Sequence, residues 1–199
     1  MIKIAIFASG SGTNAQRITE YFRDHPENIG VDVILSNRKD SFVLERSRIL
    51  GIPSVTFSRQ EFYETDCIPN LLKEHSIEYI ILAGFLWFVP ESVLKAYPDK
   101  ILNIHPALLP GYGGKGMYGM KVHEAVISNH DKDSGITIHL VNEKYDEGQI
   151  LFQANCSIDK SDTPESLAEK IHALEYRYFP LVIENYILKR NPYYELGES

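Results

Sequence analysis

The chain opens on the stretch Ile2-Lys3-Ile4-Ala5-Ile6-Phe7-Ala8-Ser9-Gly10-Ser11-Gly12-Thr13-Asn14-Ala15, which decides the fold. Its first part, Ile2 to Ala8, is short, almost entirely apolar and rich in isoleucine, which is the pattern of a buried β-strand. Glycines follow, and the helical spacing of apolar residues begins near Asn14. A strand, a glycine turn and a helix in this order indicate the start of an α/β domain.

The same alternation of apolar runs and amphipathic stretches continues along the chain. Further strands are predicted at Val31 to Ser36, Pro53 to Phe57, Tyr79 to Ala83 and Lys100 to Ile104, and helices begin near Phe42, Glu61 and Pro90. Strands separated by helices form parallel sheets, because right-handed crossovers leave few other arrangements. We therefore expect a Rossmann-like, open, mostly parallel twisted sheet with helices on both faces.

The last part of the chain has a different pattern. A helix is predicted at Lys121 to Asn129, followed by two strands, Gly135 to Val141 and Gln149 to Ser157, with a short connection between them. Such connections join antiparallel strands, which we place at the far side of the sheet. Helical spacing then runs from Thr163 to Lys189, with Pro180 inside it. Since proline removes a helical hydrogen bond, we expect two helices or one bent helix here.

The composition indicates a protein that acts on small molecules. Its 199 residues suffice for one domain, and 44% of them are hydrophobic, enough to fill a core. The net charge is −7 and basic residues are scattered, so no nucleic-acid-binding or membrane-binding surface is indicated. No apolar run approaches the length of about 18 residues that a membrane span needs. The two cysteines, Cys67 and Cys156, lack metal-ligand spacing and favour the reducing cytoplasm.

The segment Gly10 to Ala15 matches the dinucleotide-binding pattern G-x-G-x-x-A. That interpretation needs an acid at the end of the second strand, but Asp32 lies at its start and Ser36-Asn37 at its end. The lysine of a nucleoside-triphosphate loop is missing as well. What remains is a closely approachable backbone with free amides at a positive helix terminus, which predicts a bound phosphate. The alternative is a plain glycine turn with Thr13 or Asn14 capping the helix.

A second group of polar residues begins with Asn103-Ile104-His105-Pro106 and is completed by Asp146. Asn103 and His105 are two positions apart, so their side chains point to one face of an extended strand. An amine that attacks an acyl carbon needs a stabilised oxyanion and two proton transfers, which an amide, a histidine and a carboxylate can share. We expect Asp146 to orient His105 and to raise the pKa of its imidazole. Taken alone, His105 is better explained as a core histidine and Asp146 as a turn residue.

The other histidines, at positions 25, 75, 123, 130, 139 and 172, form no local zinc-binding pattern, and we expect no metal site. We interpret His123 and His172 as surface or helix-packing residues. His139 is expected to support the site, because its strand leads toward Asp146. Glycine makes up five of the nine residues from Gly111 to Gly119, which is typical of a mobile loop beside a ligand.

The motifs occur in a fixed order in five segments: Ala8 to Asn14, Leu82 to Phe85, Asn103 to Pro110, Gly135 to His139 and Asp146 to Ile150. Together, over nearly the whole chain, they resemble the phosphoribosylglycinamide formyltransferases of the folate-dependent formyltransferase family. The resemblance implies transfer of a formyl group from 10-formyltetrahydrofolate to glycinamide ribonucleotide in purine biosynthesis. The products would be formylglycinamide ribonucleotide and tetrahydrofolate.

The resemblance also implies roles for individual residues. The family's catalytic trio corresponds to Asn103, His105 and Asp146. The ribonucleotide's phosphate would be bound by Gly12, Thr13 and Asn14, and its ribose by Glu175. The folate would contact Asn103 and two walls, made by Leu86, Trp87, Phe88 and Val89 and by His139, Leu140 and Val141. The single domain of residues 1–199 would have a phosphate-binding half at about 1–100 and a folate and catalytic half at about 80–190.

Two features depart from the family pattern. Trp87 stands where many relatives have an arginine, so its ring either stacks on the folate or covers the rim of the pocket. The Gly111 to Gly119 loop is longer than usual, and Lys115 within it is either a phosphate contact or an ordinary solvated lysine.

Three other functions compete with this one. A formyltetrahydrofolate deformylase uses the same trio on water, and methionyl-tRNA formyltransferase shares the folate machinery. We expect neither the extra amino-terminal domain of the first nor the carboxyl-terminal barrel and basic surface of the second. A binding regulator without catalysis would not need the intact trio. The expected partners are the ribonucleotide and reduced folate, with no nucleic acid and no membrane, and both a monomer and a homodimer remain open.

Overall fold

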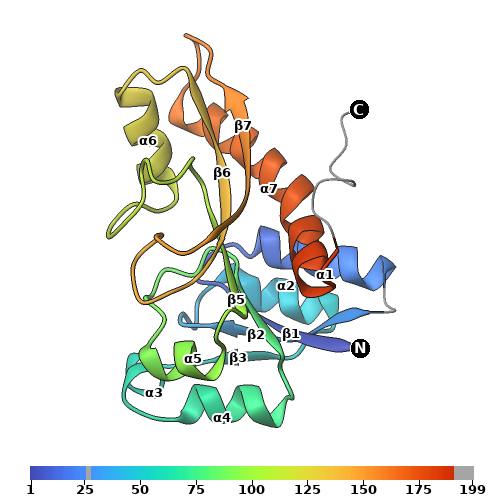
Figure 1. Ribbon diagram of the computed structural model, residues 1–199. Coiled ribbons are helices and arrows are strands. Elements are labelled where there is room, and N and C mark those ends of the chain that lie inside the picture. Colours follow the sequence, from blue (N-terminus) through green and yellow to red (C-terminus); the bar gives the residue numbers. More distant parts are fainter. Residues whose placement is uncertain (26–27, 191–199) are drawn as a thin grey trace.

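The computed structural model describes residues 1–25 and 28–190, which contain a seven-stranded sheet of order β3-β2-β1-β4-β5-β6-β7 (Figure 1). The strands are β1 (Ile2–Phe7), β2 (Ile29–Ser36), β3 (Ser54–Thr56), β4 (Tyr79–Leu82), β5 (Ile101–His105), β6 (Asp133–Leu140) and β7 (Ile150–Ser157). Pairing is parallel from β3 to β5 and antiparallel for β5 with β6 and β6 with β7. The predicted open, mostly parallel sheet with antiparallel strands in the C-terminal part is confirmed.

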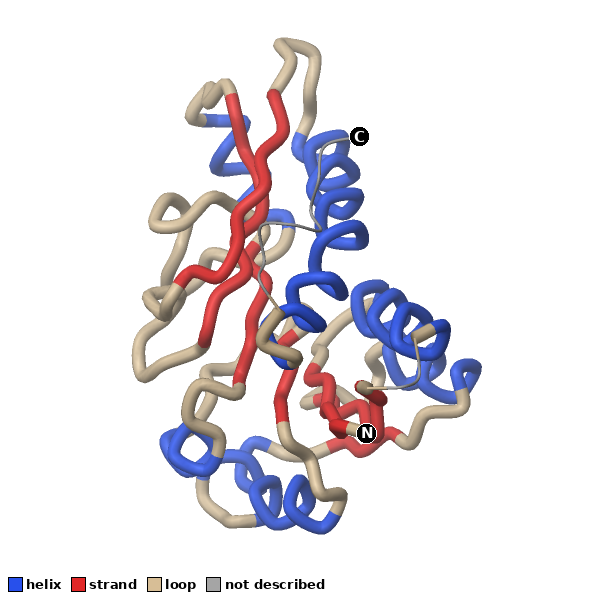
Figure 2. The backbone as a smooth tube through the Cα atoms, turned by 45° about the vertical axis from the view of Figure 1, so that its right-hand side comes forward, coloured by secondary structure: helices blue, strands red, loops and turns tan. Residues whose placement is uncertain are grey.

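Helices cover both faces of this sheet, as Figure 2 shows. One face carries α1 (Thr13–Asp24), α2 (Phe42–Leu50), α6 (Met120–Ser128) and α7 (Pro164–Ile187), and the other carries α3 (Arg59–Tyr63), α4 (Cys67–Glu74) and α5 (Glu91–Ala96). Among the described helices, none has the length and apolar character to cross a membrane.

The core lies in two layers because successive side chains of a strand point to opposite faces. In β1, Ile4 and Ile6 pack in the core cluster shared with α1 and α7, whereas Ala5 and Phe7 pack in the cluster shared with α3 and α4. Each of these four side chains is at most 1% exposed. The nearly uninterrupted apolar run of β1 is thus explained by burial on both faces.

The central strand β1 has β2 on one side and β4 on the other, so the connections that leave these strands diverge. This is the switch point at which open α/β sheets bind ligands, outside the carboxyl ends of the strands. Ser9 ties the loops together: its amide donates to the Gly84 carbonyl at 3.1 Å, and its hydroxyl accepts from the Leu86 amide at 2.9 Å. The two sides of the crevice therefore have a fixed spacing.

The amphipathic stretch that begins near Glu61 forms two short helices, α3 and α4, instead of one. Ser58 and Glu61 make a capping box at the start of α3. Pro69 accounts for the break, because a proline is tolerated in the first turn of α4 but not in the interior of a continuous helix.

Helix α7 continues through Pro180, so the expectation of two separate helices is wrong. Pro180 has no N–H to offer the carbonyl of Tyr176, one turn earlier. The side chain of Arg17 in α1 takes over this role, because its Nε donates to that carbonyl at 3.3 Å. A donor from the neighbouring helix thus satisfies the acceptor that proline leaves open.

Candidate active site

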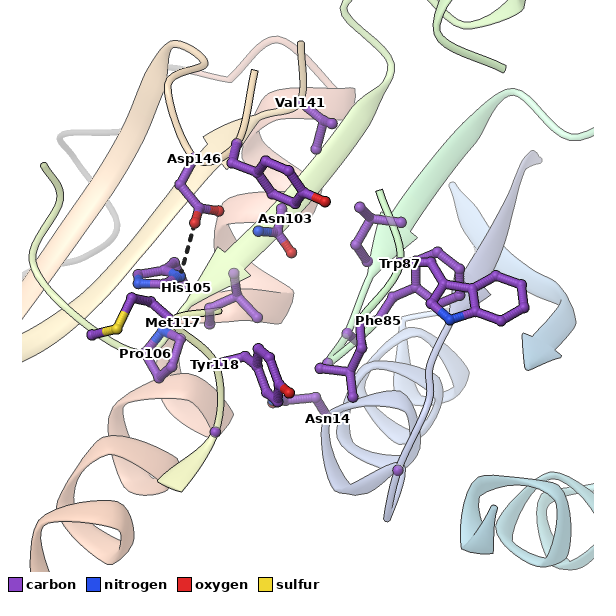
Figure 3. Close-up of a pocket in the computed structure, with 18 of the residues that line it drawn as sticks. Asn14, Phe85, Trp87, Asn103, His105, Pro106, Met117, Tyr118, Val141 and Asp146 are labelled. Carbon is purple, nitrogen blue, oxygen red and sulfur yellow. Dashed lines mark ion pairs between the residues drawn. The ribbon is translucent and has the colours of Figure 1, made fainter. Parts of the chain in front are cut away.

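A cavity of about 610 Å³ opens at the carboxyl edge of the sheet (Figure 3). Its volume is within the range of small-molecule sites. The wall is built from the glycine loop after β1, the loop after β4, the end of β5, the glycine-rich loop before α6, the β6–β7 connection and α7. Segments far apart in the sequence therefore meet around one space.

Gly12 shapes the glycine loop at one end of this cavity. Its φ is 76°, and a Cβ at this position would lie 2.4 Å from Cγ2 of Val43 in α2. Both facts require glycine. Gly12, Thr13 and Asn14 line the cavity where α1 begins, and the first amides of a helix have no partner within it. This end of the cavity is therefore suited to an anion such as a phosphate.

The alternative of a helix cap by Thr13 or Asn14 is wrong, because α1 has no side-chain cap hydrogen bond. Asn14 instead donates from Nδ2 to Oε2 of Glu175 in α7 at 2.8 Å. Its Oδ1 is buried without a hydrogen-bond partner among the described residues. Burial raises the pKa of the Glu175 carboxyl to about 7, although the hydrogen bond from Asn14 lowers it. The pair offers hydrogen-bonding groups to hydroxyls of a ligand.

Strand β5 brings Asn103 and His105 to the same edge. Leu102 and Ile104 pack in one core layer, so Asn103 and His105 point to the opposite face, as the two-residue spacing predicts. Asn103 pairs in register with His139 of β6. Figure 3 shows Asn103, His105 and Asp146 together in the cavity. The structure thus brings the three predicted catalytic side chains to one place.

His105 is 4% exposed, and both ring nitrogens have defined neighbours. Nε2 lies 2.7 Å from the carbonyl oxygen of Tyr112. Because a carbonyl only accepts hydrogen bonds, Nε2 carries a proton. Nδ1 lies 3.6 Å from Oδ2 of Asp146, the ion pair drawn in Figure 3. In the neutral ring, Nδ1 is therefore the basic nitrogen.

Asp146 reaches the site from the β6–β7 connection, with its backbone in the left-handed region at φ 54°. The Gly114 amide donates to its Oδ2 at 2.9 Å, which fixes the oxygen that faces His105. Burial acts to raise the pKa of Asp146, but the contacts with His139, Gly114 and His105 outweigh it, and the pKa is lowered. The carboxyl is thus ionised at neutral pH.

Asp146 acts to raise the pKa of His105, as expected, but burial of the ring outweighs this effect. Burial of the ring lowers the pKa of His105 below its usual value, and the charge of Asp146 and the Tyr112 carbonyl oppose this without compensating it. His105 is therefore neutral at pH 7 in the resting site, and its Nδ1 is free to accept a proton.

His139 contacts both Asn103 and Asp146. Its Nδ1 donates to the carbonyl of Leu140 at 2.8 Å. Its Nε2 lies 3.1 Å from Nδ2 of Asn103 and 3.6 Å from Oδ1 of Asp146. In the neutral ring with the proton on Nδ1, Nε2 accepts one N–H of Asn103 and leaves the second for a ligand. His139 thus holds the Asn103 amide in place.

The other end of the cavity is largely apolar and is lined by Leu86, Phe88, Val89 and Val141. Leu140, expected in the same wall, does not line the cavity, because its side chain is 6% exposed and belongs to the core. This end has the hydrophobic lining that a flat ring system needs.

Trp87 also lines the cavity and packs within an aromatic cluster. Its ring centroid lies 5.9 to 6.5 Å from those of its four aromatic neighbours, Phe57, Phe62, Tyr63 and Phe85. The guanidinium of Arg59 lies over the indole, 5.8 Å from its centroid. Trp87 is thus held in the wall by its aromatic neighbours, and both of its interpretations, stacking on the folate and covering the rim, stay predictions.

Two histidines that we interpreted as surface or helix-packing residues, His123 and His172, line the cavity. His123 of α6 is 3% exposed and lines the cavity, and its Nδ1 has no hydrogen-bond partner among the described residues. Its burial lowers its pKa to about 4. His172 of α7 lines the cavity one turn before Glu175, a spacing that places both on one helix face. That spacing was a usable signal for His172, whereas no local pattern marked His123.

Two further predictions concern a metal site and Lys115. Within residues 1–25 and 28–190, no group of three or more histidine, cysteine or acidic side chains is placed to hold a metal ion. Lys115 is exposed and lines the cavity, so both of its interpretations stay predictions.

Comparison with known proteins finds similarity over nearly the whole chain. Residues 2–183 match the family model described as formyl transferase. Phosphoribosylglycinamide formyltransferase of Bacillus subtilis is 34% identical over 188 residues, which cover 92% of this chain and 94% of that protein. The chloroplastic phosphoribosylglycinamide formyltransferase of Arabidopsis thaliana is 39% identical over 186 residues, or 91% of this chain. The chain spans only 64% of the length of this plant relative.

Solved structures are similar in fold as well as in sequence. The crystal structure of glycinamide ribonucleotide transformylase 1 from Symbiobacterium toebii superimposes with a TM-score of 0.87 at 32% identity. The match covers 96% of this chain and 89% of the other.

Proposed function

Since the chain belongs to the formyl transferase family, we propose that it transfers the formyl group of 10-formyltetrahydrofolate to the amine of glycinamide ribonucleotide in purine biosynthesis. The products are formylglycinamide ribonucleotide and tetrahydrofolate. The observation that carries the proposal is a single cavity that His105 and Asp146 share with the start of α1 and Glu175. One end suits a ribonucleotide and the other a folate.

The ribonucleotide fits the polar end. Its phosphate binds at the start of α1, where Gly12, Thr13 and Asn14 line the cavity, because a helix terminus favours an anion. Its ribose hydroxyls bond to Glu175 and to the unpartnered Oδ1 of Asn14. The pterin of the folate binds in the apolar end, against the loop after β4 and against β6. Both ligands then reach the polar trio.

The reaction forms a bond between the amine nitrogen and the formyl carbon and breaks the bond from that carbon to N10 of the folate. Asn103 donates an N–H to the oxyanion of the tetrahedral intermediate, which contributes about 3 kcal/mol. Nδ1 of His105 accepts the proton that the amine loses, and the carboxylate of Asp146 stabilises the imidazolium. His105 then returns the proton to N10. One carbon–nitrogen bond thus forms as another breaks, and the proton lost by the amine ends on N10.

This reaction takes place in the cytoplasm. The two cysteines are unpaired in the structure, in keeping with a reducing compartment.

The test is a spectrophotometric assay of the purified protein with 10-formyltetrahydrofolate, with and without glycinamide ribonucleotide. Folate turnover that requires the ribonucleotide is the expected result. Turnover without it would mean a deformylase, and no turnover in either case would mean a binding protein or another acceptor. His105→Ala is expected to abolish transfer and to keep ribonucleotide binding, measured by calorimetry. Normal turnover or lost binding in this variant would contradict the role of His105.

A further inference from the structure

The glycine-rich loop between β5 and α6 contacts both His105 and Asp146 through its backbone. The Tyr112 carbonyl accepts the Nε2 proton of His105 at 2.7 Å, and the Gly114 amide donates to Asp146 at 2.9 Å. Both contacts come from residues 112–114. The course of the backbone there decides where the ring proton of His105 lies and where the carboxylate points.

This course has an unusual backbone conformation at Tyr112. Its φ is 54°, which a bulky residue rarely adopts and which costs about 1–2 kcal/mol relative to an ordinary conformation. The side chain supplies the contact that holds it: the phenol donates to Oδ2 of Asp131 at 2.5 Å, and the ring packs on the core. A hydrogen bond to a carboxylate is among the stronger ones in proteins.

Asp131 is a firm anchor for this bond. It lies between the end of α6 and the start of β6, and its Oδ1 accepts from Nδ2 of Asn129 at 2.8 Å. Its own amide donates to the Val126 carbonyl at 3.4 Å. The bond from Tyr112 therefore ties the loop before α6 to the turn after it.

Two acceptors compete for the single ring proton of neutral His105. Asp146 attracts a proton on Nδ1, and the Tyr112 carbonyl attracts one on Nε2. Only the Nε2 tautomer leaves a lone pair on the nitrogen that faces Asp146, and only this tautomer can accept the amine proton there. A carbonyl in good alignment is thus needed to keep the proton away from the carboxylate.

We propose that Tyr112 is a positioning residue: through its hydroxyl bond to Asp131 it aligns its own carbonyl with Nε2 of His105 and so selects the reactive tautomer. Tyr112 is not among the residues that line the cavity, so it acts through His105 and not on a substrate. The effect on turnover rests on the proposed function, whereas the effect on the tautomer does not.

The tautomer is measured directly by nuclear magnetic resonance of protein labelled with ¹⁵N in its histidines, with the His105 signals assigned by their loss in His105→Ala. The parent is expected to show His105 protonated on Nε2. Tyr112→Phe, which removes one hydroxyl, is expected to move most of the proton to Nδ1. The groups that face the ring, Asp146 and His139, are unchanged in this variant. An Nε2 tautomer that is retained in Tyr112→Phe would overturn the proposal.

The kinetic test is the same substitution in the formyl-transfer assay. Tyr112→Phe is expected to lower kcat about tenfold, with KM for both substrates within about twofold, because the reactive tautomer becomes a minor species. Tyr186→Phe is the matched control: it removes a hydroxyl that donates to the Asp99 carbonyl at 2.7 Å, remote from His105, and is expected to keep the parent kcat. A raised KM at constant kcat in Tyr112→Phe, or an equal loss in Tyr186→Phe, would contradict the proposal.

Asp131→Ala provides a second route to the same result. It removes the acceptor and leaves the Tyr112 ring in place, so it is expected to shift the tautomer as Tyr112→Phe does, and the double variant is expected to be no worse than either. It also decides the question if Tyr112→Phe does not fold. If the parent shows no formyl transfer at all, the proposed function fails, and the tautomer of His105 still decides the role of Tyr112.

Discussion

At the scale of single residues, the chemistry of His105 depends on two opposing effects. Burial favours the neutral ring, and the carboxylate of Asp146 favours the charged one. Burial dominates at rest, so Nδ1 holds a lone pair when substrate arrives. The charged form then arises during turnover, beside a carboxylate that stabilises it.

Replacing Asp146 with asparagine removes one of these effects. Since the carboxylate raises the pKa of His105, Asp146→Asn lowers that pKa further and moves the acid limb of the pH profile of kcat to lower pH. The value of kcat falls by about a hundredfold, because the imidazolium loses its counter-charge. The pH–rate profile of formyl transfer measures both changes. An acid limb that stays in place would show that the two side chains are not coupled.

The control for this substitution is Glu147→Gln, which removes the neighbouring carboxylate. The Glu147 side chain is 63% exposed and pairs with Lys144. Its charge is screened by solvent, so the variant is expected to keep the parent profile.

At the scale of elements, the start of α1 depends on the close approach of α2. Gly12→Ala is expected to cost about 3 kcal/mol of stability, because it adds overpacking against Val43 to an unfavourable positive φ. Gly10→Ala is the control in thermal unfolding, because a Cβ there meets nothing within 4 Å. Adding Val43→Ala is not expected to rescue Gly12→Ala, since Cβ and Cα of Val43 also lie at 2.6 and 2.8 Å. Equal stability of the two alanine variants would contradict this view.

Helix α7 depends on α1 in turn. Arg17→Ala is expected to cost about 1 kcal/mol, because the Tyr176 carbonyl loses its donor. In a Pro180→Ala background the new backbone N–H can supply that bond, so the same substitution is expected to cost less. Chemical denaturation of the four proteins of this cycle measures the difference. Identical costs in both backgrounds would show that Arg17 does not substitute for the missing N–H.

The elements themselves were largely predictable, because strand burial and helix spacing are local properties. The strand at Ile2 to Ala8 and the helix from Asn14 follow from their own residues. The continuation of α7 through Pro180 was not predictable, because the donor that satisfies the Tyr176 carbonyl comes from Arg17, which is distant in the sequence. The break before α4 was missed although Pro69 marks it, because the apolar spacing runs on across it.

The site was predictable where one strand presents it. The spacing of Asn103 and His105 gave their common face, and Asp146 was added to them as the carboxylate that the chemistry needs, before the resemblance pointed to the same trio. The sign of the pKa shift of His105 was not predictable, because burial at this position depends on the whole fold. For the same reason the carbonyl of Tyr112 was missed, since a backbone contact leaves no mark on residue type.

At the scale of the whole molecule, two buried groups of the cavity make stability depend on pH in opposite directions. His123 has its pKa lowered to about 4, so as the pH falls below the usual value of 6.5 the unfolded chain takes up a proton and the folded one does not. The contribution of His123 to the free energy of unfolding is therefore lost as the pH falls from about 6.5 to about 4. Glu175 has its pKa raised to about 7 from 4.5, so its contribution is complete below pH 4.5 and is lost as the pH rises to about 7.

Each shift of about 2.5 units corresponds to roughly 3 kcal/mol at most, so the two contributions largely cancel between pH 4.5 and 6.5. We expect His123→Gln to leave Glu175 unopposed, so that the free energy of unfolding rises on acidification from pH 7 to 5, and Glu175→Gln to have the reverse effect. Urea denaturation of the parent and both variants at several pH values measures how the free energy of unfolding changes with pH. Packing losses from the substitutions lower this free energy equally at every pH, so they leave its slope unchanged. Parallel curves for all three proteins would mean that neither group titrates as its burial requires.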